Sequence, residues 1–182
     1  MGGDRWQQFI SATQHRAPVP YVAKAVALVG VRGTAIDLGC GAGIEARYLA
    51  DHEFRVTAVD NSPSAVESTK QCCAGLEVIV RKSSIEAVKL KEKSLDIIVA
   101  WNSLPFLEKD SVRRVLRMVE DALADGGIFV FSVLGTDDAW AATHSDMSFM
   151  TRTELRSSLT NTLWNPGEGE RDSGVKANSV PW

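Results

Sequence analysis

Residues 35–50 read Ala-Ile-Asp-Leu-Gly-Cys-Gly-Ala-Gly-Ile-Glu-Ala-Arg-Tyr-Leu-Ala, and this stretch decides the fold. A short apolar run ends at Asp37, glycines follow at positions 39, 41 and 43, and a helical pattern then begins. Glycines at this spacing let the backbone turn sharply out of a strand and let a ligand approach the main chain closely. The helix that follows begins with unpaired N–H groups and a partial positive charge. We therefore expect this turn to bind a polar ligand.

Strand and helix patterns alternate on both sides of the glycine turn. Strands are predicted at 34–38, 55–59, 76–80, 95–100 and 128–134. Helices are predicted at 4–16, 21–29, 44–51 and 63–73, then from a cap at Asp110 or Ser111 to a stop at 125–127, and from 151 to about 159. This alternation predicts an α/β fold with a Rossmann-like, doubly wound, mostly parallel sheet and helices on both faces, in three layers (α/β/α).

The chain of 182 residues is expected to form a single domain. Its parts would be an N-terminal helical cap (1–33), a ligand-binding core (34–135) and a partial C-terminal part (136–182). The apolar fraction of 45% and the charged fraction of 24% are those of an ordinary globular protein.

Charge and cysteine content narrow the expected partners and location. The net charge of −3 gives no reason to expect a nucleic-acid partner, and we expect no membrane association, because no apolar run is long enough to cross a bilayer. Cys40, Cys72 and Cys73 lack the spacing of metal ligands or of a disulfide framework, so we expect no metal and a reducing, cytoplasmic location.

The ligand is expected where strand order reverses, beyond the carboxyl ends of the strands. Asp60 ends the second strand, about twenty residues past the glycines, where a carboxylate accepts hydrogen bonds from both hydroxyls of a ribose. The dinucleotide fingerprint is G-x-G-x-x-G, whereas this turn is G-x-G-x-G and follows Asp37, a poor neighbour for a pyrophosphate. A dinucleotide and S-adenosyl-L-methionine both remain candidates, and the acid favours the second, which carries an ammonium and a sulfonium.

At this point the sequence resembles the class I S-adenosylmethionine-dependent methyltransferases, whose first motif is D/E-x-G-x-G-x-G. It is matched by Asp37-Leu-Gly39-Cys-Gly41-Ala-Gly43, and the resemblance extends over roughly residues 20–135 and more loosely to 160. It implies S-adenosyl-L-methionine as cofactor and transfer of its methyl group to a small-molecule acceptor. The run from 131 to 151 and residues 6–21 look like the small-molecule and tellurite-resistance-type branch of that family.

The resemblance also implies which residues bind the cofactor. Asp37 and the turn residues Gly39, Cys40, Gly41 and Gly43 would hold the methionine portion, with Asp37 near its amino group. The remaining cofactor-binding residues would be Asp60 at the ribose, Asn61 and Ser62 beside the adenine, Ser84 and Ile85 at the adenine edge, Trp101 and Asn102 at the methyl-transfer site, and Arg16 in a segment that closes over the cofactor. Ser84 departs from the acidic residue that the family commonly has there.

No catalytic residue is assigned from the sequence. A sulfonium methyl group is already activated, so transfer needs mainly alignment and exclusion of water. His144 and Asp146 are candidates for a general base, but we favour a surface-loop role for both. Trp6 and Phe9 are expected to serve packing rather than to contact substrate.

The C-terminal part departs from the family pattern. The family's sheet usually has seven strands, and the last strand would only be starting at Pro181-Trp182, so we expect it to be missing or truncated. An exposed fifth strand would then favour a homodimer. Two alternatives stay open: a cofactor-binding but catalytically impaired or truncated methyltransferase-like protein, and a nicotinamide-nucleotide-binding Rossmann enzyme.

Overall fold

A computed structural model describes residues 3–29 and 33–159 of the chain. Its main sheet has five parallel strands in the order β3-β2-β1-β4-β5. The strands are β1 (Thr34–Leu38), β2 (Arg55–Asp60), β3 (Val78–Lys82), β4 (Leu95–Ala100) and β5 (Leu123–Phe131), and a separate two-stranded sheet pairs β6 (Leu134–Gly135) with β7 (Phe149–Met150). The order reverses between β1 and β4, so a crevice is expected at the carboxyl ends of these two strands.

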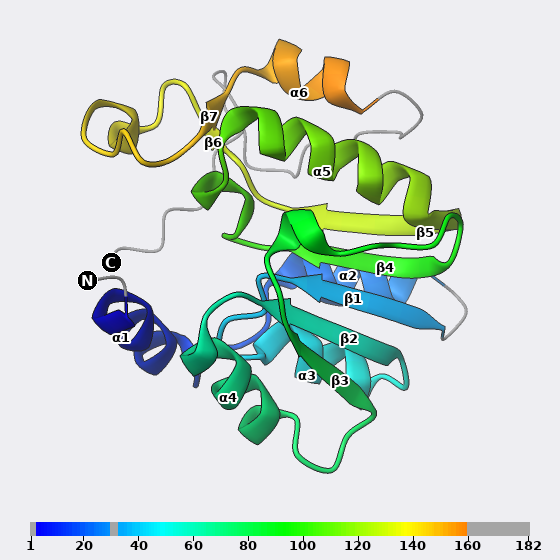
Figure 1. The fold of residues 1–182 in the computed structure, drawn as a ribbon. Coiled ribbons are helices and arrows are strands. Elements are labelled where there is room, and N and C mark those ends of the chain that lie inside the picture. The colour runs from blue at the N-terminus through cyan, green and yellow to red at the C-terminus, as the bar shows by residue number, and fades with distance from the viewer. Residues whose placement is uncertain (1–2, 30–32, 160–182) are drawn as a thin grey trace.

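Helices cover both faces of the sheet (Figure 1). They are α1 (Gly3–Thr13), α2 (Pro20–Leu28), α3 (Ile44–Asp51), α4 (Pro63–Cys72), α5 (Lys109–Ala122) and α6 (Arg152–Ser158), with short 3₁₀ turns at Ile85–Ala87, Leu104–Phe106 and Ala139–Ala142. One buried cluster joins α2 and α3 to one face of the sheet, and a second joins α5 and α6 to the other. The predicted three-layer α/β/α class is therefore confirmed.

The burial pattern explains why these segments form these layers. All but one of the six residues of β4 are buried, which agrees with a central strand that is covered on both faces. On α5, Val112, Val115, Leu116 and Val119 recur at helical spacing and are all buried against the sheet. Residues of β4 and the apolar face of α5 therefore pack together in one of the two buried clusters.

The predicted starts of β3 and of α5 were wrong. β3 begins at Val78 rather than at residue 76, because a turn with Gly75 at φ +82° occupies the residues before it. The helix predicted from Asp110 or Ser111 has Glu108 at its N-cap, without a side-chain cap. Asp110 and Ser111 instead bond Arg113 and Arg114 one turn further on.

The fifth strand also differs from its prediction at 128–134. It starts directly after α5, where Leu123 pairs with Leu95, and a register irregularity follows before Ile128 pairs with Ile97. The predicted helix stop at 125–127 therefore lies inside β5, where a Cβ on Gly127 would come within 2.9 Å of two carbonyl oxygens. Residues 160–182 lie outside the described residues, so the missing final strand and the homodimer stay predictions.

The predicted capping box of α6 is confirmed. Thr151 Oγ1 accepts the N–H of Glu154, and the Glu154 carboxylate accepts the N–H of Thr151 at 2.8 Å. Lys109 and Arg113 of α5 approach the same carboxylate at 2.7 and 3.0 Å. These contacts hold α6 to α5, and hydrogen bonds from Lys109 and from the Thr151 backbone lower the pKa of Glu154 from 4.5 to about 2.

Glu154→Gln should therefore remove a pH-dependent part of the stability. A carboxyl group with a depressed pKa in the folded state stabilises the protein above its unfolded pKa, and this contribution is lost as pH falls toward 2. The melting temperature of the wild type should exceed that of Glu154→Gln at pH 6, and the gap should close between about pH 4.5 and 2. Exposed Glu92→Gln is the control. A gap that is independent of pH would contradict the role given to the carboxylate.

Candidate functional site: a cleft where the strand order reverses

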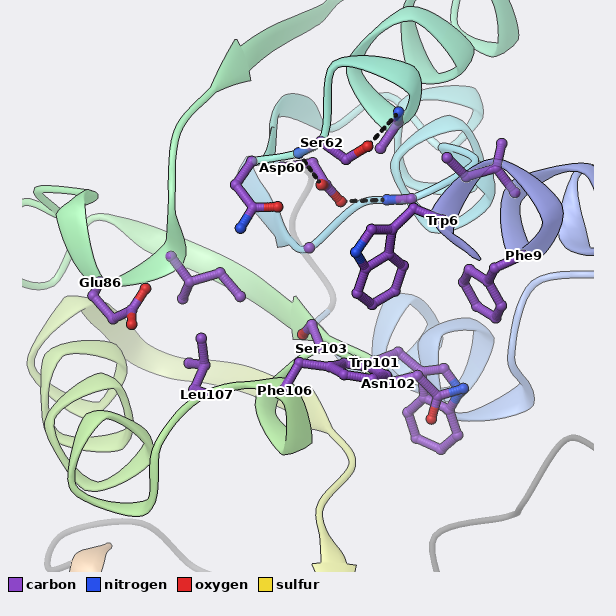
Figure 2. A pocket seen from close by; sticks show the side chains of 16 residues that line it. Trp6, Phe9, Asp60, Ser62, Glu86, Trp101, Asn102, Ser103, Phe106 and Leu107 are labelled. Atoms are coloured by element: carbon purple, nitrogen blue, oxygen red, sulfur yellow. Dashed lines mark hydrogen bonds between the residues drawn. The ribbon is translucent and has the colours of Figure 1, made fainter. Parts of the chain in front are cut away.

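A cleft opens beyond the carboxyl ends of β1, β2 and β4, between α1 and the loops that follow these strands (Figure 2). The cleft is partly open to solvent. It is lined by Trp6, Phe9, Ile10, Gly39, Gly41, Asp60, Asn61, Ser62, Ala65, Ile85, Glu86, Trp101, Asn102, Ser103, Phe106 and Leu107. Eight of these were predicted from the sequence: Gly39, Gly41, Asp60, Asn61, Ser62, Ile85, Trp101 and Asn102.

The glycine turn forms the floor of the cleft. Gly39, Gly41 and Gly43 have φ angles of +80°, +51° and +82°, which side-chain-bearing residues rarely adopt. A Cβ on Gly39 would collide with the Cβ of Ser103, and one on Gly43 would lie 2.9 Å from the Cα of Thr69. A Cβ on Gly41 would meet only Phe9, at 4.0 Å, because it would point into the cleft. Two of the glycines are therefore required by packing and the third keeps the cleft open.

Asp60 joins the second strand to the glycine turn. Its Oδ2 accepts the N–H of Gly41 at 3.0 Å, and its Oδ1 accepts the N–H of Ser62 at 2.8 Å. Ser62, not Asp60, caps α4, since Ser62 Oγ accepts the N–H of Ala65. An ionised carboxylate accepts about four hydrogen bonds, so Asp60 retains acceptor capacity toward the cleft that it lines.

Asp37 lies beneath the turn and outside the lining of the cleft. Its side chain is buried, and Oδ2 has no hydrogen-bond partner among the described residues. Burial, followed by the nearby carboxylates of Glu45 and Asp60, raises the pKa of Asp37 well above its usual range, while Arg16 opposes the rise. A buried oxygen without a partner costs free energy unless a ligand or water supplies a donor. This position therefore suits a cationic group.

Arg16 does not line the cleft in this structure. Its two guanidinium nitrogens bond the two oxygens of Glu45 on α3, each at 2.6 Å, and Glu45 also accepts the N–H of Val19 at 3.2 Å. Glu45 is buried, so this bidentate pair ties the segment after α1 to the helix that follows the glycine turn.

The other predicted residues outside the lining have structural partners. Cys40 is buried, where burial raises the pKa of its thiol, and it accepts a hydrogen bond from Thr69 at 3.2 Å. Gly43 begins α3 in the left-handed region. Ser84 precedes the 3₁₀ turn that carries Ile85 and Glu86 into the cleft. The acid that the family commonly has at position 84 is thus absent, while the neighbouring Glu86 reaches the cleft.

The two ends of the cleft differ in character. Figure 2 shows Glu86 and Leu107 at one end, and Trp6, Phe9, Trp101 and Asn102 at the other. Asp60 lies between them, above the glycine turn. A ligand whose ribose lies at Asp60 would therefore extend toward Glu86 and Leu107 on one side and toward the aromatic side chains on the other.

Sequence reasoning missed the aromatic wall. Trp6 and Phe9 lie on α1, which the sequence marks only as an amphipathic helix, and they were predicted to serve packing. In the structure Trp6 packs edge-on against Phe106 at 4.8 Å between ring centres, and all three rings line the cleft. The other missed lining residues are Ile10, Ala65, Glu86, Ser103 and Leu107. No local motif marks them, since the contact joins segments about a hundred residues apart.

The candidate bases and other site types gain no support from the geometry. His144 stacks on Trp140 at 5.0 Å, and neither His144 nor Asp146 lines the cleft. Within 3–29 and 33–159, no group of three or more His, Cys, Asp or Glu side chains is arranged to hold a metal ion. No helix in the same ranges is both long and apolar enough to span a bilayer.

Comparisons with known proteins agree with the geometry. A family model described as a methyltransferase domain matches residues 35–127. The ubiquinone biosynthesis O-methyltransferase of Methylocella silvestris is 28% identical over 138 residues, which cover 66% of this chain and 53% of that protein. The sarcosine/dimethylglycine N-methyltransferase of Aphanothece halophytica is 29% identical over 103 residues, 53% of this chain and 36% of that protein.

A solved structure shows the same fold at similar identity. The S-adenosylmethionine-dependent methyltransferase from Mesorhizobium loti matches with a TM-score of 0.55 and 27% identity, over 64% of this chain and 53% of that one. The chain spans about half of the first curated relative and about a third of the second. Residues 35–127, which the family model matches, include the glycine turn and the strands β2, β3 and β4. The likeness to a tellurite-resistance-type branch stays a prediction.

Proposed function

Because the chain belongs to the methyltransferase-domain family, we propose that it binds S-adenosyl-L-methionine in the cleft and transfers its methyl group to a small-molecule acceptor. The observation that carries this proposal is the hydrogen bond from the Gly41 N–H to Asp60, which brings the glycine turn and the ribose-binding acid into one cleft. The relatives bear methyltransferase names, but their acceptors differ, so their names leave the acceptor open.

The residues present fit the cofactor. Asp37 Oδ2, which is buried and has no hydrogen-bond partner among the described residues, lies beneath the turn and would attract the ammonium of the methionine portion. Asp60 would accept the ribose hydroxyls, and Asn61, Ser62, Ile85 and Glu86 line the end left for the adenine. The bound cofactor supplies a methyl group on a positively charged sulfur.

The chain's own residues would then align the acceptor and exclude water. The aromatic side chains of Trp6, Phe9 and Phe106 close the methyl end of the cleft from α1 and from the loop after β4. Transfer in line with the carbon–sulfur bond needs this alignment more than it needs acid–base chemistry. The aromatic and apolar side chains that line this end support a small organic acceptor.

Titration calorimetry with S-adenosylhomocysteine tests the proposal directly. We expect one site per chain, with NADH failing to compete, and transfer of label from methyl-tritiated S-adenosylmethionine to an organic acceptor. Binding of NADH without S-adenosylhomocysteine would establish the nicotinamide alternative. Binding without transfer to any acceptor would indicate a catalytically impaired protein.

Gly41→Ala should weaken cofactor binding while the protein still folds. The left-handed backbone costs an alanine about 1–2 kcal/mol, but the new methyl group meets no atom closer than Phe9 at 4.0 Å. Because it points into the cleft, we expect at least a tenfold loss of S-adenosylhomocysteine affinity by calorimetry, with a cooperative thermal transition retained. Gly126→Ala is the matched control, since Gly126 has a similar φ of +80°, open space around it and no place in the cleft. Equal affinity in both variants would place the ligand elsewhere.

A further inference from the structure

Asn102 has an unusual conformation at the methyl end of the cleft. It follows β4 with φ +52°, one of three non-glycine residues at positive φ among those described. Asparagine adopts this left-handed region more readily than most residues with a side chain, and such positions often occur at functional sites. Asn102 also lines the cleft, so its conformation needs a cause in its contacts.

Ser132, which follows β5, supplies that cause. The Asn102 N–H donates to Ser132 Oγ at 2.7 Å, and the Ser132 hydroxyl donates back to Asn102 Oδ1 at 3.1 Å. Ser132 is buried, so this two-bond contact is shielded from water. It turns the amide oxygen toward Ser132 and leaves the Nδ2 group, with two N–H donors, without a hydrogen-bond partner in the described part of the chain.

The surroundings of Asn102 are flat, apolar and without positive charge. Trp6, Phe9, Phe106 and Trp101 line this end of the cleft, and Trp101 packs against Tyr21 at 5.7 Å between ring centres. No Lys, Arg or His is among the described lining residues, whose charged members are Asp60 and Glu86. Aromatic walls favour flat, unsaturated ligands. The two carboxylates disfavour a ligand with a localised negative charge.

A fixed N–H donor at the methyl-transfer end discriminates between acceptor atoms. An oxygen nucleophile has spare lone pairs, so one can accept from Nδ2 while another attacks the methyl carbon. A neutral amine has a single lone pair, which cannot do both. An amine would instead need an acceptor for its N–H, but Asn102 Oδ1 is turned toward Ser132.

From these observations we propose that the acceptor is an acidic hydroxyl on a flat ring, a phenol or enol, whose oxygen is held by Asn102 Nδ2, and that Ser132 positions Asn102. This rests on the proposed function and names its substrate class. The hydroxyl loses its proton to solvent, since no described lining residue at this end is a base. The oxygen lone pair then forms the O–CH₃ bond while the S–CH₃ bond breaks and its electron pair returns to sulfur, giving a methyl ether and S-adenosylhomocysteine.

The first test compares three probes that share one ring and differ in the acceptor group: 4-nitrophenol, 4-nitroaniline and 4-nitrobenzoate. Calorimetry on the protein saturated with S-adenosylhomocysteine measures their binding without turnover. We expect 4-nitrophenol to bind at least tenfold more tightly than the other two. The absorbance of bound nitrophenolate reports its pKa, which should be lower in the wild type than in Asn102→Gly, because the Nδ2 donor stabilises the ionised form.

Variants then assign the preference to the Asn102–Ser132 contact. Asn102→Gly removes the side-chain amide, and glycine suits a φ of +52°, so the variant should fold. Its preference for 4-nitrophenol over the other two probes should fall about tenfold. Ser132→Ala should lose it by a smaller factor, and Ser132→Thr, which keeps the hydroxyl, should restore it. A merely structural role of Ser132 would leave the pKa of bound nitrophenol unchanged in Ser132→Ala.

The possible outcomes separate the two proposals. Absence of S-adenosylhomocysteine binding would sink the proposed function itself. Two results would overturn the phenol assignment alone. In both, S-adenosylhomocysteine binds normally, and either 4-nitroaniline or 4-nitrobenzoate binds more tightly than 4-nitrophenol, or none of the three probes binds. An unchanged preference in Asn102→Gly would overturn the role of Asn102.

Discussion

Asp60→Ala should weaken the binding of S-adenosylhomocysteine by about 100-fold or more. Two hydrogen bonds from ribose hydroxyls to one carboxylate would be lost, each worth about 1.5–3 kcal/mol because the acceptor is charged. A sum of about 3 kcal/mol corresponds to about 100-fold in the dissociation constant. Calorimetry measures the loss, and Asp125→Ala, which removes an exposed carboxylate far from the cleft, is the control.

The structure offers a competing explanation that the experiment must exclude. Asp60 also accepts the N–H groups of Gly41 and Ser62, so its removal can disorder the glycine turn without any contact to a ribose. An analogue of S-adenosylhomocysteine without the two ribose hydroxyls separates the effects. The wild type should bind the analogue about 100-fold more weakly than the parent ligand, and Asp60→Ala should bind the two equally. Discrimination that survives in the variant would refute the ribose assignment.

The glycine turn and its acids were predictable because their chemistry is local. Gly39, Gly41 and Gly43 adopt positive φ angles that only glycine takes at low cost, so glycine is favoured there whatever lies around it. Asp60 follows from strand pairing, since parallel β1 and β2 end side by side. The three layers and the place of the cleft, beyond the carboxyl ends of the strands, then follow from the alternation of elements.

The aromatic wall and the Asn102–Ser132 contact were not predictable in the same way. Trp6 gives the same amphipathic pattern whether its ring faces a core or a cleft, and only its packing on Phe106 decides. Asn102 has no motif around it, and the residue that fixes its amide comes thirty positions later, from the next strand along the sheet. Sequence patterns report periodicity along the chain, whereas acceptor recognition depends on contacts between loops.

Asp37→Asn should stabilise the protein without ligand and weaken its ligand binding. Burial, with Glu45 and Asp60 nearby, raises the pKa of Asp37 in the folded state, so the unfolded chain ionises first as pH rises. The wild type therefore loses stability from about pH 4 upward until the folded-state pKa is passed. Asparagine has a similar shape and does not titrate. At pH 7 we therefore expect Asp37→Asn to have a higher melting temperature than the wild type.

The same substitution should weaken ligand binding, although it stabilises the free protein. Ionised Asp37 attracts the ammonium of S-adenosylhomocysteine, so binding to the wild type should release a proton below the raised folded-state pKa of Asp37 and should tighten as pH rises toward that pKa. Asp37→Asn should bind at least tenfold more weakly at pH 8 and show no such dependence. Calorimetry in two buffers of different ionisation enthalpy counts the proton. A variant that is less stable at every pH, or that binds as tightly as the wild type, would show that Asp37 is structural. Stability gained together with affinity lost would instead identify Asp37 as a carboxylate retained for its ligand at a cost to the fold.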